Sequence, residues 1–135
     1  MYNIKIILYY MTDLYKHTDV NELKYKDFNI KKKITVNKSV VNNKYGILIF
    51  YRPDCSHCQE SVFLWSQLAN DFKNFNIMSY NVDDFESGND KLREYIIIPS
   101  FPTIKYITKT GTMQKFDEKI KYDNLFFFMC KKLKC

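Results

Sequence analysis

The sequence lacks long apolar runs and has few cysteines, and each shortage excludes a class of protein. Nothing in the 135 residues approaches the ~18 consecutive apolar residues of a membrane-spanning helix. Residues 1–11 hold only a short apolar stretch and no small-residue cleavage site, which disfavours a signal peptide. Four cysteines do not make a disulfide scaffold at this length. We therefore expect a chain that has no membrane span and does not rely on a disulfide framework.

Alanine is nearly absent, whereas lysine, asparagine, isoleucine and tyrosine are overused. This bias indicates an A/T-rich genome, such as that of a large DNA virus, a parasite or a low-GC bacterium. For localisation we favour the cytoplasm or the virion of a large DNA virus over the ER lumen or another secretory compartment. The length is enough for one domain, and 46% of the residues are hydrophobic, which predicts a packed interior.

The formal net charge is +6, but the basic residues form no long stripe. The surplus lies mainly at residues 31–33 and in the tail, at Lys131, Lys132 and Lys134. No nucleic-acid-binding motif accompanies these charges, so a solvated surface explains them better than contact with a phosphate backbone. We expect no nucleic-acid partner.

The spacing of apolar residues predicts strands that alternate with helices. The apolar run 47–51 predicts a strand buried on both faces. A helix is expected over 55–75, where apolar residues recur every three or four positions. The other expected elements are a short strand near 23–25, a strand at 76–82, a short helix at 91–95 opened by Asn89 or Asp90, a hairpin of 103–107 with 112–116, and a last helix at 123–133. This order predicts an α/β domain at residues 23–135, with a central mixed β-sheet flanked by helices on both faces, after an N-terminal extension at residues 1–22.

Cys55 and Cys58 follow the strand 47–51 directly, and two thiols at this spacing can switch between dithiol and disulfide. The free N–H groups and positive dipole end at a helix start favour a Cys55 thiolate. A protonated His57 would favour it further, whereas Asp54, the expected N-cap, would oppose it. Cys58 lies one turn into the helix, on its apolar face. We therefore predict that Cys55 is the nucleophile and that Cys58 is the shielded resolving thiol.

Simpler interpretations exist for the same residues. The pair could be half of a zinc site or structurally inert, but zinc usually requires a second pair at suitable spacing, and Cys130 and Cys135 lie far along the chain. His57 could be a solvent-facing bystander. We expect no metal and no cofactor beyond a redox-active Cys55–Cys58 disulfide. Cys130 is expected to serve as a small apolar residue and Cys135 as an exposed thiol.

Two separate segments resemble the thioredoxin superfamily. Residues 50–59, Phe-Tyr-Arg-Pro-Asp-Cys-Ser-His-Cys-Gln, resemble the active-site segment of thioredoxins. They are more similar still to protein disulfide isomerase domains, which typically read Phe-Tyr-Ala-Pro-Trp-Cys-Gly-His-Cys-Lys. Residues 100–103, Ser-Phe-Pro-Thr, resemble the family's loop of Gly, a hydrophobic residue, cis-Pro and Thr, with Pro99 as a competitor for the proline. The resemblance implies a thioredoxin-like fold.

The resemblance also implies a substrate groove beside the cysteines. Pro102 is expected to be cis and to face the pair, although an ordinary trans proline is the alternative. Phe101 and Thr103 would border the groove and pair with substrate backbone. Asp54 and Ser56, which flank the nucleophile, are expected to contact substrate as well.

Some positions depart from the family pattern. A buried carboxylate commonly assists the resolving thiol, but Ile49 occupies its position here, and Ser79 replaces a common lysine near it. Phe63 replaces the proline that kinks the active-site helix. Deprotonation of Cys58 would then rely on water or on His57, and turnover would be slow.

These observations predict a thiol–disulfide oxidoreductase that exchanges disulfides with protein substrates. Its partners would be proteins carrying thiols or disulfides and an upstream reductase or sulfhydryl oxidase, and we expect a monomer. The His before the second cysteine predicts a reduction potential nearer the isomerase value of about −180 mV than that of thioredoxin, about −270 mV. The alternative is a binding or structural module of the same fold, packaged in a virion, with little turnover.

Overall fold

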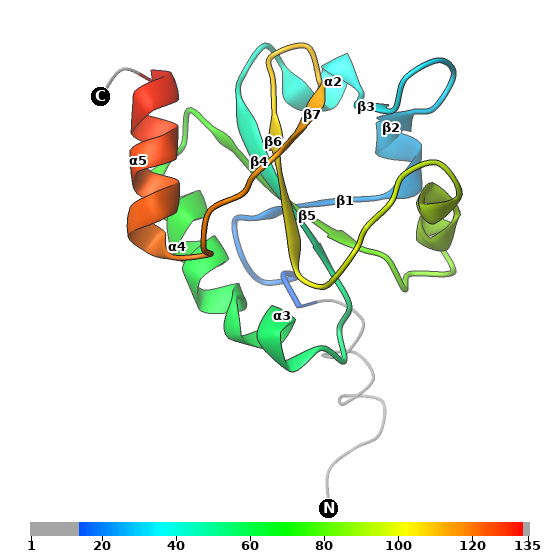
Figure 1. Ribbon diagram of the computed structural model, residues 1–135, viewed down its shortest axis with the longest axis horizontal. Helices are drawn as coiled ribbons and strands as arrows, with labels where there is room; N and C mark the ends of the chain where they lie inside the picture. The colour runs from blue at the N-terminus through cyan, green and yellow to red at the C-terminus, as the bar shows by residue number, and fades with distance from the viewer. Residues whose placement is uncertain (1–13, 134–135) are drawn as a thin grey trace, which may run out of the picture.

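Five strands form one mixed sheet in the order β1-β5-β4-β6-β7 (Figure 1). The computed structural model describes residues 14–133, so Cys135 and most of the predicted extension lie outside the described residues. In sheet order the strands are β1 (Asn21–Leu23), β5 (Asn76–Asn81), β4 (Gly46–Tyr51), β6 (Thr103–Ile107) and β7 (Met113–Lys115). β1, β5 and β4 are parallel, β6 runs antiparallel to β4, and β7 runs antiparallel to β6. The predicted central mixed sheet is therefore confirmed.

β4 lies at the centre of this sheet, and all six of its residues are buried. Ile47, Ile49 and Tyr51 point to one face, and Leu48 and Phe50 point to the other, because side chains alternate along a strand. Each face carries its own apolar cluster. We call the cluster that contains Ile49 the helix-side core and the one that contains Leu48 the hairpin-side core.

The helix-side core is covered by three helices: α3 (Ser56–Glu60), α4 (Val62–Asp71) and α5 (Tyr122–Leu133). Each contributes buried side chains, among them Cys58, Trp65 and Met129. Trp65 is fully buried, and its indole N–H donates to the carbonyl oxygen of Met78 on β5 at 2.8 Å. That bond joins α4 to the sheet and so helps to hold the adjoining α3 in place.

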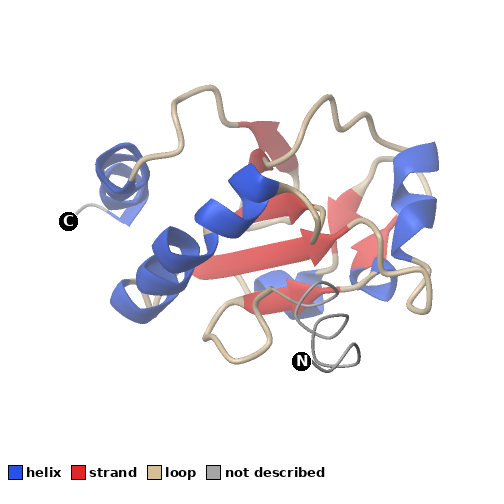
Figure 2. Cartoon of the chain, turned by 90° about the horizontal axis from the view of Figure 1, so that it is seen from below, coloured by secondary structure: helices blue, strands red, loops and turns tan. Residues whose placement is uncertain are grey.

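The hairpin-side core is covered by short elements: η1 (Tyr25–Asp27), β2 (Phe28–Asn29), β3 (Thr35–Val36), α2 (Lys38–Val41) and η2 (Asn89–Glu94). β2 and β3 pair as a separate antiparallel ribbon. Figure 2 shows the strands running between the helices. The predicted helices on both faces are therefore confirmed, although the β2–β3 ribbon was not predicted.

The single helix predicted over 55–75 is wrong, because α3 and α4 are separate helices and α4 ends at Asp71. The break lies at Ser61, whose hydroxyl donates to the carbonyl oxygen of His57 at 2.9 Å. A serine that bonds back to the preceding turn in this way slightly destabilises a helix. The helix after β4 is thus interrupted at Ser61, without the proline that Phe63 replaces.

Several other expectations can be compared with the structure. The strand at 76–82 and the hairpin of 103–107 with 112–116 are confirmed within one or two residues, as is the last helix. The short helix expected at 91–95 is the 3₁₀ helix η2, which Gly88 rather than Asn89 or Asp90 caps. Cys130 packs against the helix-side core as expected, but it is also disulfide-bonded. Within residues 14–133, every helix is too short or too polar to cross a bilayer.

The domain division between residues 22 and 23 stays a prediction. That boundary falls inside β1, and Tyr15 and Val20, which precede β1, belong to the helix-side core.

Candidate active site

Cys55 lies at the carboxyl end of β4, where the chain turns into α3. Cys55 itself is the N-cap of this helix, with extended backbone angles, and its Sγ accepts a hydrogen bond from the Cys58 amide at 3.4 Å. The prediction of Asp54 as the N-cap is therefore wrong. The thiol takes the capping position, so a backbone N–H of the helix start points at the sulfur that would carry negative charge.

The two thiols differ in exposure. Cys55 is partly exposed, whereas Cys58 is 0% exposed and lies in the helix-side core, and both are free. Burial, followed by the hydrogen bond with Cys55, raises the pKa of the Cys58 thiol to about 12. Cys58 can therefore react only when something removes its proton.

The loop before β6 faces the cysteines. Its Phe101–Pro102 peptide bond is cis, and the Cys55 thiol donates to the Phe101 carbonyl oxygen at 3.7 Å. The pairing of Phe50 with Thr103 places the start of β6 beside the end of β4. The structure thus brings Phe101, Pro102 and Thr103 to the carboxyl end of β4, where Cys55 lies.

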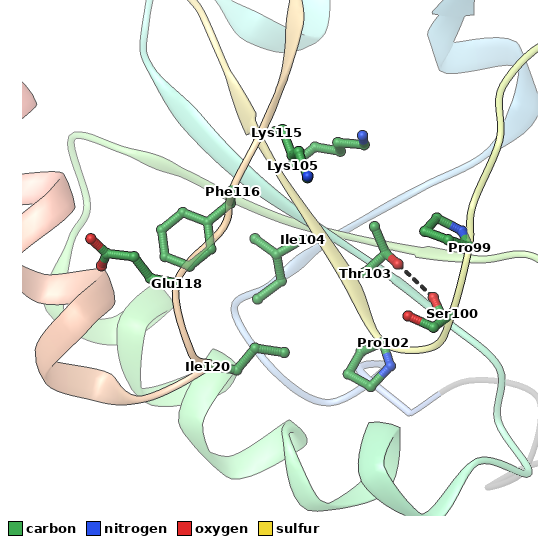
Figure 3. Close-up of a pocket in the computed structure, with 10 residues that line it drawn as sticks. All are labelled: Pro99, Ser100, Pro102, Thr103, Ile104, Lys105, Lys115, Phe116, Glu118 and Ile120. Carbon is green, nitrogen blue, oxygen red and sulfur yellow. Dashed lines mark hydrogen bonds between the residues drawn. The ribbon is translucent and has the colours of Figure 1, made fainter.

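Two surface hollows flank Pro102. One, of about 230 Å³, lies along β6 and is lined by Ser100, Pro102 and Thr103 among others (Figure 3). In that view the Thr103 hydroxyl donates to the Ser100 carbonyl oxygen. The other, of about 470 Å³, is lined by His57, Glu60, Ser61, Leu64, Phe101, Pro102, Lys119 and Ile120. An extended chain crossing Pro102 would meet both hollows.

Among the predicted polar site residues, His57 and Asp54 both face solvent. The His57 side chain is 77% exposed, and its Nδ1 lies 3.5 Å from a Glu60 carboxylate oxygen. The Asp54 side chain is 61% exposed and lies 3.9 Å from Arg52. Ser56 is also exposed. These residues surround the mouth of the site rather than the buried thiol.

Arginines surround the Phe101 ring, which sequence reasoning did not indicate. The guanidinium carbons of Arg52 and Arg93 lie 5.8 and 5.4 Å from the ring centroid. Arg52 is further held by Asp83, whose hydrogen bond, with the nearby acidic charges, raises the pKa of Arg52. The Asp54 charge that was expected to oppose a Cys55 thiolate is thus partly balanced by Arg52.

A carboxylate that the sequence did not indicate lies on the side of the sheet against which Cys58 packs. Glu22 on β1 accepts hydrogen bonds from the hydroxyls of Tyr51 and Ser79. Ser79 pairs with both Glu22 and Ile49 across the sheet, so Glu22 lies two strands away from the isoleucine. The sequence signal was faint: one acidic residue in a three-residue edge strand, next to a buried leucine.

The fold and the site together define a class. A five-stranded mixed sheet leads from its central strand into a Cys-x-x-Cys helix, and a cis-proline loop lies beside the first cysteine. The sequence model of the Thioredoxin family matches residues 27–131, and the chain belongs to that family.

Solved structures agree with this fold. The J-Trx1 fragment of ERdj5 is similar with a TM-score of 0.71 at 17% identity, over 100% of this chain and 62% of that one. Thioredoxin f from spinach chloroplast gives 0.60 at 18% identity, over 83% and 91% of the two chains. The germline-specific thioredoxin Deadhead from Drosophila melanogaster gives 0.56 at 22% identity, over 69% and 85%. The chain thus spans somewhat less than two thirds of the ERdj5 fragment, and at these identities the likeness shows the fold alone.

Proposed function

We propose that this protein is a thiol–disulfide oxidoreductase that acts on protein substrates through Cys55 and Cys58. The observation that carries the proposal is the asymmetry of the pair: a partly exposed thiol caps the helix, and a fully buried thiol lies one turn behind it, with its amide bonded to the first sulfur. Such an asymmetry separates the roles of attack and resolution. A structurally inert pair would give no reason for one of the two thiols to be exposed to solvent.

The reaction would proceed in two exchanges. The Cys55 thiolate attacks a substrate disulfide, forms a mixed disulfide and releases one substrate thiolate. Cys58 then attacks the Cys55 sulfur, the bond to substrate breaks, and the second substrate thiolate leaves and takes up a proton. The substrate gains two electrons and the protein retains a Cys55–Cys58 disulfide, so no further cofactor is required. In the reverse direction the same steps oxidise a substrate dithiol.

Substrate would lie across the loop at Phe101, Pro102 and Thr103. The Phe101 backbone lies just before β6 begins, where an extended peptide can add its own backbone hydrogen bonds. The hollows on either side of Pro102 suit the side chains of such a peptide. Asp54 and Ser56, exposed beside the nucleophile, and His57 in the larger hollow would contact the residues nearest the disulfide.

Three further features belong to this proposal. A reductase or sulfhydryl oxidase upstream, a monomeric state and an isomerase-like potential stay predictions. Within the described residues, no group of three or more His, Cys, Asp or Glu side chains could hold a metal ion.

The test combines turnover with trapping. The intact chain should reduce insulin with dithiothreitol as electron source, and Cys55→Ser should abolish the reduction. Cys58→Ala should leave Cys55 joined to substrates as stable mixed disulfides, and Cys55→Ala should trap none. A chain that neither reduces insulin nor catalyses oxidative refolding, and that traps nothing, would instead be a binding or structural module.

A further inference from the structure

A carboxylate lies on the side of the sheet against which α3 and its resolving thiol, Cys58, pack. Along β1, Leu23 is buried in the hairpin-side core, so the preceding residue, Glu22, points to the opposite face. That face belongs to the helix-side core, which contains Cys58, Ile49 and Tyr51. Glu22 is partly exposed, and covering part of a charged side chain is costly unless it is hydrogen-bonded.

Two hydroxyl groups hold the Glu22 carboxylate in place. The Tyr51 hydroxyl donates to one oxygen, and the Ser79 hydroxyl donates to the other. This arrangement suits a carboxylate, which only accepts hydrogen bonds. It also ties the partly exposed Glu22 side chain to residues of both β4 and β5.

Tyr15 shares the helix-side core with Cys58 and packs on one of the two residues that hold Glu22. Its ring packs edge-on against Tyr51, with ring centroids 5.3 Å apart, and its buried hydroxyl has no hydrogen-bond partner among the described residues. Burial, followed by the charges of Glu22 and Cys58, raises the pKa of Tyr15. Tyr15 and Cys58 belong to the same buried core, and Tyr15 packs against the tyrosine whose hydroxyl donates to Glu22.

Other candidates for removing the Cys58 proton are poorly placed. His57 and Asp54 have mostly exposed side chains, at 77% and 61%, whereas Cys58 is fully buried. Burial, the largest cause of the raised Cys58 pKa, persists when Cys55 is joined to substrate, so few Cys58 thiols ionise unaided at neutral pH. Resolution at a useful rate requires a nearby acceptor.

We propose that Glu22 is a positioning residue for the resolving exchange, acting on Cys58 through the hydroxyls of Tyr15 and Tyr51. As the Cys58 sulfur attacks Cys55 and the bond from Cys55 to substrate breaks, the Cys58 proton passes through these hydroxyls to the Glu22 carboxylate. The departing substrate thiolate takes a proton from solvent, and Glu22 later returns its own to solvent. The proposal rests on the exchange reaction proposed above and adds no reactant to it.

The experiment separates the two exchanges in one reaction. A small aromatic disulfide that releases a coloured thiolate gives one equivalent when Cys55 attacks and a second when Cys58 resolves. Stopped-flow absorbance of the reduced full-length chain should show both phases. We expect Glu22→Gln, which keeps the size and one acceptor oxygen, to leave the first phase within about twofold. The second phase should slow by about 100-fold at neutral pH, the lower end of the range for acid–base assistance.

The pH profile distinguishes this role from a structural one. The titratable groups on this side of the sheet include Tyr51 on β4, whose hydroxyl bonds to Glu22, Tyr15, which packs against Tyr51, and Cys58 on α3 in the same core. With Glu22 present, the second phase should depend little on pH around neutrality. In Glu22→Gln it should rise about tenfold per pH unit, because hydroxide must then generate the thiolate, and the two rates should converge at high pH.

The matched control is Asp71→Asn on α4. Asp71 also accepts a hydrogen bond from a tyrosine hydroxyl, that of Tyr122 at 2.7 Å, but it is exposed and away from the cysteines. It should change neither phase. Equal second phases in Glu22→Gln and the unaltered chain would overturn the proposal, as would equal slowing of both phases. If Glu22→Gln does not fold, Tyr15→Phe and Tyr51→Phe replace it, and an unslowed second phase in both would also refute it. An unaltered chain that releases no second thiolate would instead refute the proposed function.

Discussion

Selective alkylation of the two active-site thiols tests the central asymmetry of the site. Burial is the largest cause of the raised Cys58 pKa of about 12, ahead of the hydrogen bond with Cys55. An ordinary thiol ionises near pH 8.5, so at neutral pH the thiolate population of Cys58 should be roughly 3,000-fold smaller than that of an unperturbed cysteine. Steric exclusion of a 0% exposed side chain slows the reaction further.

The assay follows iodoacetamide labelling by mass spectrometry across a pH series, one thiol at a time. Cys58→Ser isolates Cys55, and Cys55→Ser isolates Cys58. In Cys55→Ser the contribution of the neighbouring sulfur disappears but burial remains, so the Cys58 midpoint should still lie about one unit or more above 8.5. The same variants in guanidinium should label alike, which checks that folding causes the difference. Faster labelling, or a lower midpoint, at Cys58 than at Cys55 would refute the assignment of nucleophile and resolver.

Two further predictions concern stability. Gly111→Ala should lower the free energy of unfolding by about 2–4 kcal/mol, because φ is +89° and a Cβ would lie 2.1 Å from the Val36 carbonyl oxygen; Gly88→Ala, with φ +73° but no atom nearer than 3.7 Å, should cost about 1 kcal/mol. Stability should also fall as pH rises above about 10, because burial raises the pKa of tyrosines such as Tyr80, so the unfolded chain releases those protons first. Chemical denaturation measures all three quantities.

Specific results would contradict these two predictions. Equal losses for the two glycine variants would mean that positive φ alone, and not the contact at Gly111, sets the cost. Stability that stayed level or increased between pH 10 and 12 would mean that the raised tyrosine pKa values are not a property of the folded state.

Most strands of the sheet could be predicted from the sequence because their signals are strong and local. The apolar run of β4, the alternation of β6 and the glycine turn before β7 each depend on neighbouring residues alone. The β2–β3 ribbon was missed because strands of two residues carry no period. The break at Ser61 was missed because an apolar repeat continues across it, and the serine hydroxyl that bonds to the His57 carbonyl oxygen there leaves no mark on that repeat.

The candidate active site likewise has parts that local sequence predicted and parts that it did not. Cys55 and Cys58 were identifiable because their spacing and their position after a buried strand are properties of the chain itself. The position of Asp54 was misjudged because several residues before a helix can cap it, and the backbone angles at Cys55 decide which one does. Arg93 and Phe101 meet across a loop, so no local pattern could pair them.

The identity and order of the chemical groups follow from the amino-acid sequence alone: a strand, two thiols one helical turn apart, and a proline loop later in the chain. Local spacing is enough for this, because hydrogen bonds between near neighbours build helices and turns. Packing of distant segments sets how deeply each thiol is buried and how far the Cys58 pKa is raised, and it places Glu22 of the edge strand on the side of the sheet where Cys58 lies. Those properties depend on strand register and on desolvation by residues distant in sequence, which no local pattern contains.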